Sequence, residues 1–293
     1  MLNLNLKDIP CFGVAGNFTG HLEQAGEAKD FLNVKTKDSL APKALFPTYI
    51  PEKNAIYSAQ GLEKVPEYLK VFPFSADKII FPLGQANLQA ESECAIIADL
   101  DWQEVDGKKT AVSLKPFAFG ASNDCSIRKE GAKKISEKKN WGKSSKGLSA
   151  NLIPIDSFDE NGILNRYRIA SFIVRYDKVL VYGEDSAVRN YTYIYQKLSE
   201  WIIEKLNYQK NEGPAEEISL YLQEADFPQK IMVSIGATRY TDFGEHNFLI
   251  SGDKSVVVLY PEDKYSFNDI SLLVKNNDFS DKEISFLVQK VIL

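Results

Sequence analysis

Residues 91–98 have the sequence ESECAIIA, in which two glutamates precede an apolar run. The apolar run predicts a buried β-strand. Because side chains alternate between the two faces of a strand, Glu91 and Glu93 are expected on the same face, about 7 Å apart. Neighbouring carboxylates repel each other unless a cation lies between them, and their oxygens favour Mg²⁺, Mn²⁺ or Ca²⁺ over zinc. Two solvent-facing glutamates at a strand edge fit the same pattern, so spacing alone leaves both interpretations open.

A third acidic side chain follows in residues 121–128, which have the sequence ASNDCSIR. Asp124 is a candidate metal ligand, although Asn123-Asp124 also fits an ordinary Asx turn. Asp99 and Asp101 are rival ligands, because they too follow the glutamate-containing strand closely. Spacing does not choose among these three aspartates.

A basic run occupies residues 128–146, with eight Lys and Arg against two Glu. A solvated surface is the simplest interpretation of such a run. Lys143 stands apart because it lies in Trp141-Gly142-Lys143-Ser144, where the aromatic ring and the glycine restrict the chain, and it is a candidate for binding an anionic substrate. Trp141 is the only aromatic residue of the run, so a stacking platform for nucleic acid is not indicated. A phosphate-binding P-loop is excluded because the preceding glycine motif is missing.

The composition is that of an ordinary soluble protein. The chain has 293 residues, of which 44% are apolar and 26% charged, and its net charge is -5. This charge gives no reason to expect a nucleic acid or an anionic membrane as a partner. The start of the chain has no basic or apolar signal region, and no apolar run approaches the ~18 residues of a spanning helix. Three scattered cysteines suit reduced thiols, so we expect a cytoplasmic protein.

Apolar patterns predict mostly strands and a few helices, hence the α+β class. One helix is expected at residues 193–207, whose apolar side chains lie on one helical face. A second is expected at 280–293, where Ser280 and Glu283 form a capping box, and a short helical pattern spans 21–31. Four prolines between Pro42 and Pro66 exclude long regular elements there. Strands are expected at residues 11–15, 78–82, 94–98, 110–114, 116–120, 167–174, 178–183, 230–235 and 255–260.

Together these segments resemble the fumarylacetoacetate hydrolase (FAH) superfamily. Residues 16–21, GNFTGH, are similar to the family's N-terminal Gly-x-Asn-Tyr-x-x-His, and residues 91–93 to its Glu-x-Glu. Residues 123–128, NDCSIR, resemble its Asn-Asp-Val-Ser-x-Arg, and residues 141–144 resemble its Trp-x-x-Gly-Lys-Ser type segment. The order and approximate spacing agree, and a weaker likeness extends to about Tyr260.

This resemblance implies a β-rich, FAH-like mixed β-sandwich roll of the α+β class. It divides the chain into a small N-terminal region at 1–75 that carries the His21 segment, an FAH-like metal-binding domain at 76–262, and a C-terminal helical extension at 263–293. The family usually forms homodimers, and its members cleave, decarboxylate, hydrate or isomerise oxo-acids.

The resemblance also implies a set of site residues. Glu91, Glu93 and Asp124 correspond to metal ligands, which decides against Asp99 and Asp101. The remaining expected residues are His21, Gln24 and Lys143 as catalytic groups, and Asn123, Arg128, Ser144 and Thr238 as substrate-binding groups.

The implied function is a divalent-metal-dependent enzyme that acts on a small anionic oxo-acid by C–C hydrolysis, decarboxylation or isomerisation. Mg²⁺, or Mn²⁺ or Ca²⁺, stabilises an enolate in such chemistry, and Lys143 is expected to add positive charge. The alternative is a catalytically impaired FAH-like protein that binds a metal or a small acid as a sensor or scaffold.

Departures from the family pattern concern the activation of water. Hydrolytic members pair the N-terminal histidine with a glutamate three residues later, and here that position is Gln24. Glutamine can orient an imidazole, but it cannot stabilise an imidazolium as a carboxylate does. Glu27 and His246 are candidates to replace the missing carboxylate in space. Three further positions also differ from the family pattern: Thr48, Lys146 and Gly147.

Overall fold

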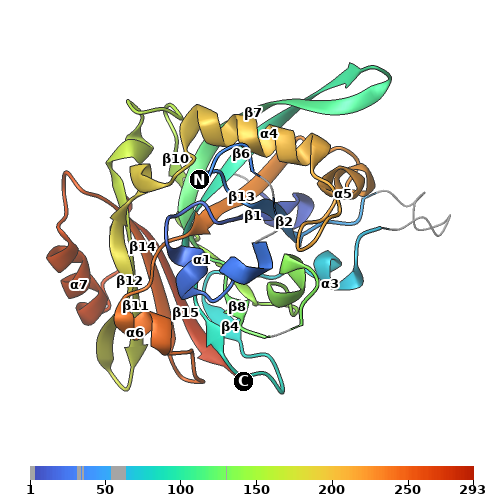
Figure 1. The fold of residues 1–293 in the computed structure, drawn as a ribbon. Coiled ribbons are helices and arrows are strands. Elements are labelled where there is room, and N and C mark those ends of the chain that lie inside the picture. Colours follow the sequence, from blue (N-terminus) through green and yellow to red (C-terminus); the bar gives the residue numbers. More distant parts are fainter. Residues whose placement is uncertain (1–3, 32–33, 35, 54–63, 130) are drawn as a thin grey trace.

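The computed structural model describes residues 4–31, 34, 36–53, 64–129 and 131–293. Within these residues the chain forms an eight-stranded and a five-stranded sheet, with a short two-stranded ribbon beside them. Helix α4 packs on the larger sheet and α7 packs on the smaller one (Figure 1). The described residues contain no helix that is both long and apolar enough to cross a membrane.

The strands and helices have the following bounds. The strands are β1 (Cys11–Ala15), β2 (Ala44–Tyr49), β3 (Phe74–Ser75), β4 (Lys78–Ile80), β5 (Leu88–Gln89), β6 (Ser92–Val105), β7 (Lys108–Asn123), β8 (Ser126–Ile127), β9 (Lys146–Leu148), β10 (Ile153–Pro154), β11 (Tyr167–Arg175), β12 (Lys178–Ala187), β13 (Lys230–Ala237), β14 (Lys254–Pro261) and β15 (Ser285–Ile292). The α-helices are α1 (His21–Gln24), α3 (Glu67–Lys70), α4 (Tyr195–Tyr208), α5 (Ile218–Glu224), α6 (Asp242–His246) and α7 (Phe267–Asn276). The 3₁₀ helices are η1 (Leu6–Asp8), η2 (Ala28–Phe31), η3 (Ile135–Lys138), η4 (Ile163–Arg166) and η5 (Val188–Asn190).

A long hairpin of β6 and β7 is the centre of the larger sheet, whose order is β2-β1-β13-β6-β7-β9-β3. Its turn, Asp106-Gly107, has positive φ at both residues, as the two-residue hairpin turn that follows the strand twist requires. Pairing runs from this turn to Ser92 opposite Asn123 at the other end. The hairpin therefore brings the two segments that carry the acidic residues side by side.

Most expected elements are confirmed. The helix expected at 193–207 is α4, with Leu198, Trp201, Ile202 and Leu206 buried. The apolar runs at 110–114 and 116–120 belong to one strand, β7, because the register shift opposite Pro116 accommodates the proline.

Two N-terminal segments differ from the expected pattern. The helical pattern at 21–31 is split into α1 and η2, since Gly26 between them has a φ of 68°. The proline-containing strand β2 lies at the edge of the larger sheet, where a missing amide is tolerated. Residues 54–63, within the proline-rich region, lie outside the described residues.

The helix expected at 280–293 is wrong. Residues 285–292 form β15, which pairs antiparallel with β14 and parallel with β4. Burial alternates along it, with Ser285, Leu287, Gln289 and Val291 buried, so the period is that of a strand. The C-terminal extension does contain a helix, but it is α7, which begins with a capping box of Ser266 and Asp269.

Strands from all three predicted segments of the chain share these sheets. In the larger sheet β1 pairs with β13, and in the smaller sheet β15 pairs with β4 and β14. The division at residues 75 and 262 stays a prediction. Cys11, Cys94 and Cys125 are buried, and none of them forms a disulfide bond.

Gln289 connects β15 with the segments around the acidic residues. Its buried Nε2 lies 3.1 Å from each of the carbonyl oxygens of Ser75, Lys78 and Lys146. Its Oε1 accepts a hydrogen bond of 3.0 Å from the Asn123 side chain. One side chain thus links the last strand to β3, β4, β7 and β9.

Replacing Gln289 by methionine tests this role. The change keeps the volume but leaves a buried amide and buried carbonyls without partners, each costing about 1–3 kcal/mol. We expect the free energy of unfolding to fall by about 3 kcal/mol, measured by urea denaturation. Lys290→Met, at the exposed neighbouring position, is the control and should change stability by less than about 0.5 kcal/mol. Equal stability of the two variants would contradict the connecting role.

Candidate active site

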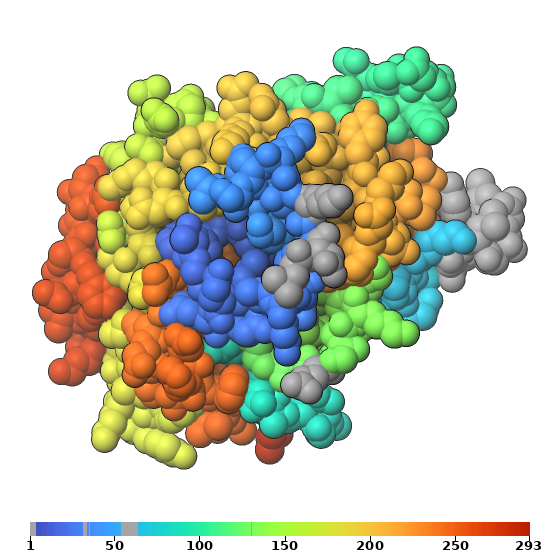
Figure 2. Space-filling view, in the orientation of Figure 1, coloured from blue at the N-terminus to red at the C-terminus, as the bar shows by residue number. Residues whose placement is uncertain are grey.

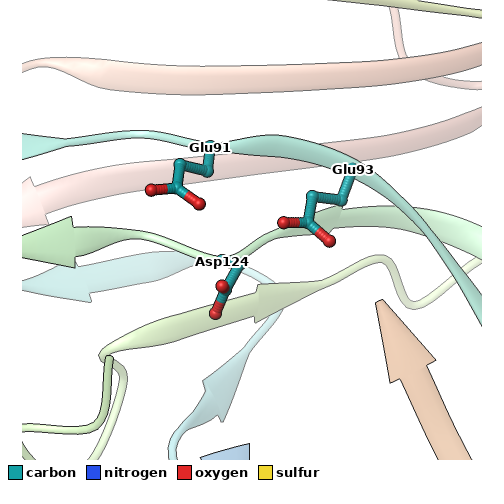
Figure 3. A group of neighbouring side chains, drawn as sticks. All are labelled: Glu91, Glu93 and Asp124. Atoms are coloured by element: carbon teal, nitrogen blue, oxygen red, sulfur yellow. The ribbon is translucent and has the colours of Figure 1, made fainter. Parts of the chain in front are cut away.

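Glu91, Glu93 and Asp124 form a buried acidic triad. Their candidate ligand atoms all lie within 4.8 Å of one another, and Figure 3 shows the three side chains turned toward one space. Glu91 directly precedes β6 and Asp124 directly follows β7, and the Asp124 amide donates to the Glu91 carbonyl at 3.0 Å. The hairpin register therefore positions all three carboxylates.

Three cationic side chains surround this triad. The Lys139 Nζ lies 2.6 Å from Glu91 Oε2 and 2.8 Å from Asp124 Oδ2. The Lys146 Nζ lies 2.9 Å from Asp124 Oδ1, and an Arg128 guanidinium nitrogen lies 2.8 Å from Glu91 Oε1. Both oxygens of Glu91 and both oxygens of Asp124 consequently face a positive charge.

These neighbours shift the pKa values in opposite directions. Burial raises the pKa of Glu91, but Lys139 and Arg128 more than offset it, and the net pKa lies below the usual range. Burial, with the negative charges of Asp124 and Glu91, raises the pKa of Glu93 well above its usual range. In the metal-free protein these surroundings therefore favour the ionised form of Glu91 and the protonated form of Glu93.

The two lysines also differ in pKa. Burial lowers the pKa of Lys139, but the carboxylates of Asp124 and Glu91 more than restore it, so its pKa lies above the ordinary value. Burial lowers the pKa of Lys146, and the attraction of Asp124 only partly offsets this. Lys139 is thus the firmly charged cation between the two carboxylates.

The ligand chemistry of the triad suits a divalent metal ion. Three carboxylates supply hard oxygen donors, which Mg²⁺, Mn²⁺ and Ca²⁺ prefer. Among the residues that the structure describes, no other group of three or more His, Cys, Asp or Glu is close enough to hold a metal. By its donor atoms, the site predicted from the sequence can hold a divalent cation.

His21 is buried and lies near this cluster. Its Nδ1 is 2.9 Å from the carbonyl oxygen of Thr238, so Nδ1 carries the hydrogen. Burial lowers the pKa of His21, and the negative charge of Glu91 only partly offsets this. The lowered pKa favours the neutral imidazole, in which Nδ1 carries the hydrogen and Nε2 the lone pair.

Gln24 does not hold the histidine in the expected way. Its side-chain nitrogen donates to the Tyr240 carbonyl and to Glu245, both at 3.1 Å, and its oxygen accepts from the Tyr240 amide at 2.9 Å. These bonds fasten α1 to the segment that follows β13. The carbonyl of Thr238, rather than Gln24, orients the imidazole of His21.

The proposed substitutes for a carboxylate partner have other roles. Glu27 accepts hydrogen bonds of 2.8 Å from Arg128 and from Lys138. His246 is exposed, and its Nδ1 lies 2.9 Å from the carbonyl of Asp242. The imidazole of His21 thus has no hydrogen-bonded carboxylate among the described residues.

Lys143 lies outside the cluster, with its side chain exposed to solvent. The buried lysine of this segment is Lys146, three residues later, because the loop turns at Ser144, whose φ is 56°. Ser144 itself is buried, and its carbonyl accepts from the Ile80 amide at 3.0 Å. Lys146, and not Lys143, is thus the lysine of this loop that contacts the triad.

Two other expected substrate-binding residues have partners within the protein. Asn123 accepts from the Glu91 amide at 3.0 Å and donates to Gln289, so it braces the triad. The Thr238 hydroxyl lies 3.2 Å from the hydroxyl of Ser92. Arg128 is the expected substrate-binding residue that reaches both the triad and a cavity.

That cavity has a volume of ≈ 450 Å³ and is rich in charged side chains. Arg128 and Lys138 are part of its wall, and Glu27 lies between them. The lining residues are Ala25, Gly26, Glu27, Lys29, Asp30, Arg128, Lys129, Gly131, Ala132 and Lys138. A larger hollow of ≈ 550 Å³ runs along α4 and contains none of the triad. On the face shown in Figure 2 the N-terminal segment, in blue, lies between α4, in gold, and α6, in orange.

Lys139 and Lys146 are the two residues in contact with the triad that the sequence does not indicate. Both lie in the basic run, which was interpreted as a solvated surface apart from Lys143. The available signal was electrostatic, because a buried carboxylate triad requires buried cations nearby. Which lysines of the run supply them depends on how the loop folds.

Comparison with known proteins gives the family directly. A family model, described as a family of unknown function (DUF5718), matches residues 27–291. The chain belongs to DUF5718. No curated protein matches its sequence.

Solved structures show which fold this DUF5718 chain has. A protein from Yersinia pestis CO92 assigned to the fumarylacetoacetate hydrolase family is 12% identical, with a TM-score of 0.51 over 100% of this chain and 96% of that one. A 2-keto-3-deoxy-D-arabinonate dehydratase complexed with magnesium and 2,5-dioxopentanoate is 13% identical, with a TM-score of 0.51 over 97% and 72% of the two chains. The 5-carboxymethyl-2-hydroxymuconate delta-isomerase from Mycobacterium smegmatis is 12% identical, with a TM-score of 0.51 over 97% and 78%.

These comparisons confirm the fold predicted from the sequence. The chain is a β-rich α+β protein with the fold of FAH structures. At identities of 12–13% the likeness shows the fold and not the reaction.

In this DUF5718 chain, hydrogen bonds of Ser136 hold in place the segment that contains Lys138 and Lys139. The Ser136 hydroxyl, in η3, donates to Glu216 Oε1 at 2.8 Å and lies 2.7 Å from the Tyr68 hydroxyl. Burial raises the pKa of Glu216 to about 7. The folded protein therefore prefers the protonated form of this carboxyl.

Replacing Glu216 by glutamine should remove a pH dependence of stability. Because the pKa of Glu216 is raised in the folded state, the protonated carboxyl contributes to the stability of the wild type. This contribution is fully present below about pH 4.5 and is lost as the pH rises through about 7. Glutamine stays neutral, so we expect the variant to gain on the wild type by about 2–3 kcal/mol between pH 4.5 and 8, measured by urea denaturation. Glu212→Gln, at an exposed site nearby, should leave the wild-type profile unchanged. Parallel profiles for wild type and Glu216→Gln would contradict the raised pKa.

Proposed function

We propose that this DUF5718 protein is an FAH-type enzyme that acts on a small anionic oxo-acid. One observation carries the proposal: Arg128 contacts the acidic triad through Glu91, at 2.8 Å, and also lines the ≈ 450 Å³ cavity. Each nitrogen of this guanidinium already bonds a side chain, namely Gln89, Glu27 or Tyr240. A planar carboxylate ligand in the cavity would therefore compete with Glu27, which lines the same cavity. The volume is in the range of cavities that hold small molecules, about 300–1,000 Å³.

Two neighbours support the class of substrate. One solved structure with this fold is a dehydratase complexed with magnesium and 2,5-dioxopentanoate, and another is a delta-isomerase of a carboxymethyl-hydroxymuconate. Both names describe chemistry on small acids. We carry over this class of chemistry, and leave open whether the reaction is C–C hydrolysis, decarboxylation or isomerisation.

Glu91, Glu93 and Asp124 are the proposed metal ligands. A divalent ion held there, Mg²⁺ or else Mn²⁺ or Ca²⁺, supplies a Lewis acid for an enolate. Arg128 and Lys138 would bind the substrate carboxylate at the cavity. Lys146 takes the charge-stabilising role that we first expected for Lys143, because it is the buried one of the two.

His21 is the proposed proton acceptor. The Thr238 carbonyl holds the hydrogen on Nδ1, so that Nε2 is free to take a proton. Among the described residues His21 has no hydrogen-bonded carboxylate partner, and the negative charge of Glu91 offsets only part of the effect of burial on its pKa. We infer that His21 takes a proton from an acidic C–H of the substrate rather than from water. Gln24 serves as a positioning residue through the segment that contains Tyr240.

The expected homodimer and the expected cytoplasmic location belong to the same proposal. The alternative function, a catalytically impaired protein that binds a small acid as a sensor or scaffold, also has a specific observation in its favour. Both carboxylates of Glu91 and Asp124 are already paired with lysine or arginine.

Turnover of oxaloacetate and of acylpyruvates tests the proposal. Arg128→Gln removes the buried cation at the cavity, so we expect kcat/KM to fall about 100-fold, mainly through a higher KM. His21→Asn removes the proton acceptor, and kcat should fall about 10²–10⁴-fold with little change in KM. Stopped assays in the presence of Mg²⁺ or Mn²⁺ measure both.

Lys133→Gln is the matched control, because it removes an exposed cation from the same basic run. It should keep wild-type kinetics. Binding of these acids by calorimetry without turnover would support the sensor or scaffold instead. Neither binding nor turnover of any of them would show that the proposed substrate class is wrong.

A further inference from the structure

The acidic triad already contains a cation of the protein's own. The ammonium of Lys139 bridges Glu91 and Asp124 at 2.6 and 2.8 Å. The other oxygen of each carboxylate is paired with Arg128 or Lys146. A metal ion that used these oxygens as ligands would have to displace at least one of these cations.

Lys139 is the side chain that a metal would displace first. The three carboxylates converge on one space (Figure 3). The Lys139 ammonium is bound to two of them, so a metal ion held by the same two oxygens would have to take its place. A divalent cation and an ammonium repel each other strongly at such separations. Of the two bridged carboxylates, Arg128 contacts only Glu91 and Lys146 contacts only Asp124. Each binds the carboxylate oxygen that Lys139 does not contact.

The backbone around Lys139 is held in place. Its amide donates to the Ser136 carbonyl at 3.0 Å, and the next residue, Asn140, donates from its side chain to the carbonyls of Thr48 and Val71 at 2.9 and 3.0 Å. Its side chain is only 3% exposed, and the ammonium lies 5.4 Å from the centre of the Phe46 ring. The backbone thus fixes the position of Lys139 beside the two carboxylates. Its flexible side chain has enough rotatable bonds to move the ammonium away from them.

We propose that Lys139 is a built-in competitor for the metal ion. Its ammonium neutralises Glu91 and Asp124 in the metal-free protein, and a divalent cation binds there only when this side chain moves away. The proposal rests on the proposed function, in which Glu91, Glu93 and Asp124 are the metal ligands. It adds that the site is regulated: the affinity for the metal ion depends on how readily the Lys139 side chain moves away from Glu91 and Asp124.

Binding of Mn²⁺ to the full chain, followed by electron paramagnetic resonance and by thermal unfolding, tests this inference. Displacing the ammonium lowers the apparent affinity of the wild type by the fraction of molecules in which the site is open. We expect Lys139→Met and Lys139→Gln to bind Mn²⁺ at least about tenfold more tightly than wild type. Lys133→Met removes a cation from the same run without touching the triad, and should match wild type.

A second readout separates competition from a general change in charge. In EDTA, Lys139→Met should melt at a lower temperature than wild type, since Glu91 and Asp124 lose the cation between them. Added Mn²⁺ should restore its melting temperature, while wild type should respond only weakly at the same concentration. Lys139→Gln, which keeps a hydrogen-bond donor, provides the comparison if the methionine variant does not fold.

The outcomes distinguish this inference from the proposed function. Equal Mn²⁺ affinity of wild type and the Lys139 variants would overturn the competition and leave the proposed enzyme intact. No Mn²⁺ binding by wild type or variants would overturn both the competition and the metal-binding part of the proposed function. Failure of the proposed substrate class is seen separately, in the oxo-acid assays.

Discussion

Buried carboxylates are stable only when opposite charges are buried with them, and this constraint shapes the region around the triad. Glu91 and Asp124 are at most 4% exposed, so Lys139, Lys146 and Arg128 must approach them through the protein interior. All three cations come from one stretch of the sequence, residues 128–146, and they contact Glu91 and Asp124 at the open end of the β6–β7 hairpin. The hydrogen bonds that fasten η3 and Asn140 hold that segment there. The electrostatic requirement of two acids thus determines the path of a loop of nearly twenty residues.

Local patterns were sufficient to predict the elements that a short stretch of chain specifies. The apolar run after Glu93 predicted β6, and the helical period predicted α4, because burial on one face is visible within a few residues. The acidic triad could also be predicted from the sequence, because the order of the motifs resembles that of a known family. The pairing register of β6 and β7 brings the three acidic residues together, and this register could not be predicted from the sequence pattern alone.

Other features depend on contacts between distant segments. The apolar residues of 284–291 fit a helix and a strand almost equally, and pairing with both β14 and β4 decides for the strand. Lys143 and Lys146 are three residues apart in one polar run, and only the turn at Ser144 determines which of them is buried. Lys139 was missed for the same reason: its charge partners lie 48 and 15 positions away in the chain.

The position of β15 has a consequence for the order of events during synthesis. This strand joins β14 to β4, and its Gln289 contacts the backbone at Ser75, Lys78 and Lys146. A nascent chain therefore carries the triad well before it carries the Gln289 amide, which bonds to Asn123, the acceptor of the Glu91 amide. The ribosome must pass residue 292 before the smaller sheet can close. Until then, the Asn123 side chain and the carbonyls of Ser75, Lys78 and Lys146 lack the hydrogen bonds that Gln289 makes with them.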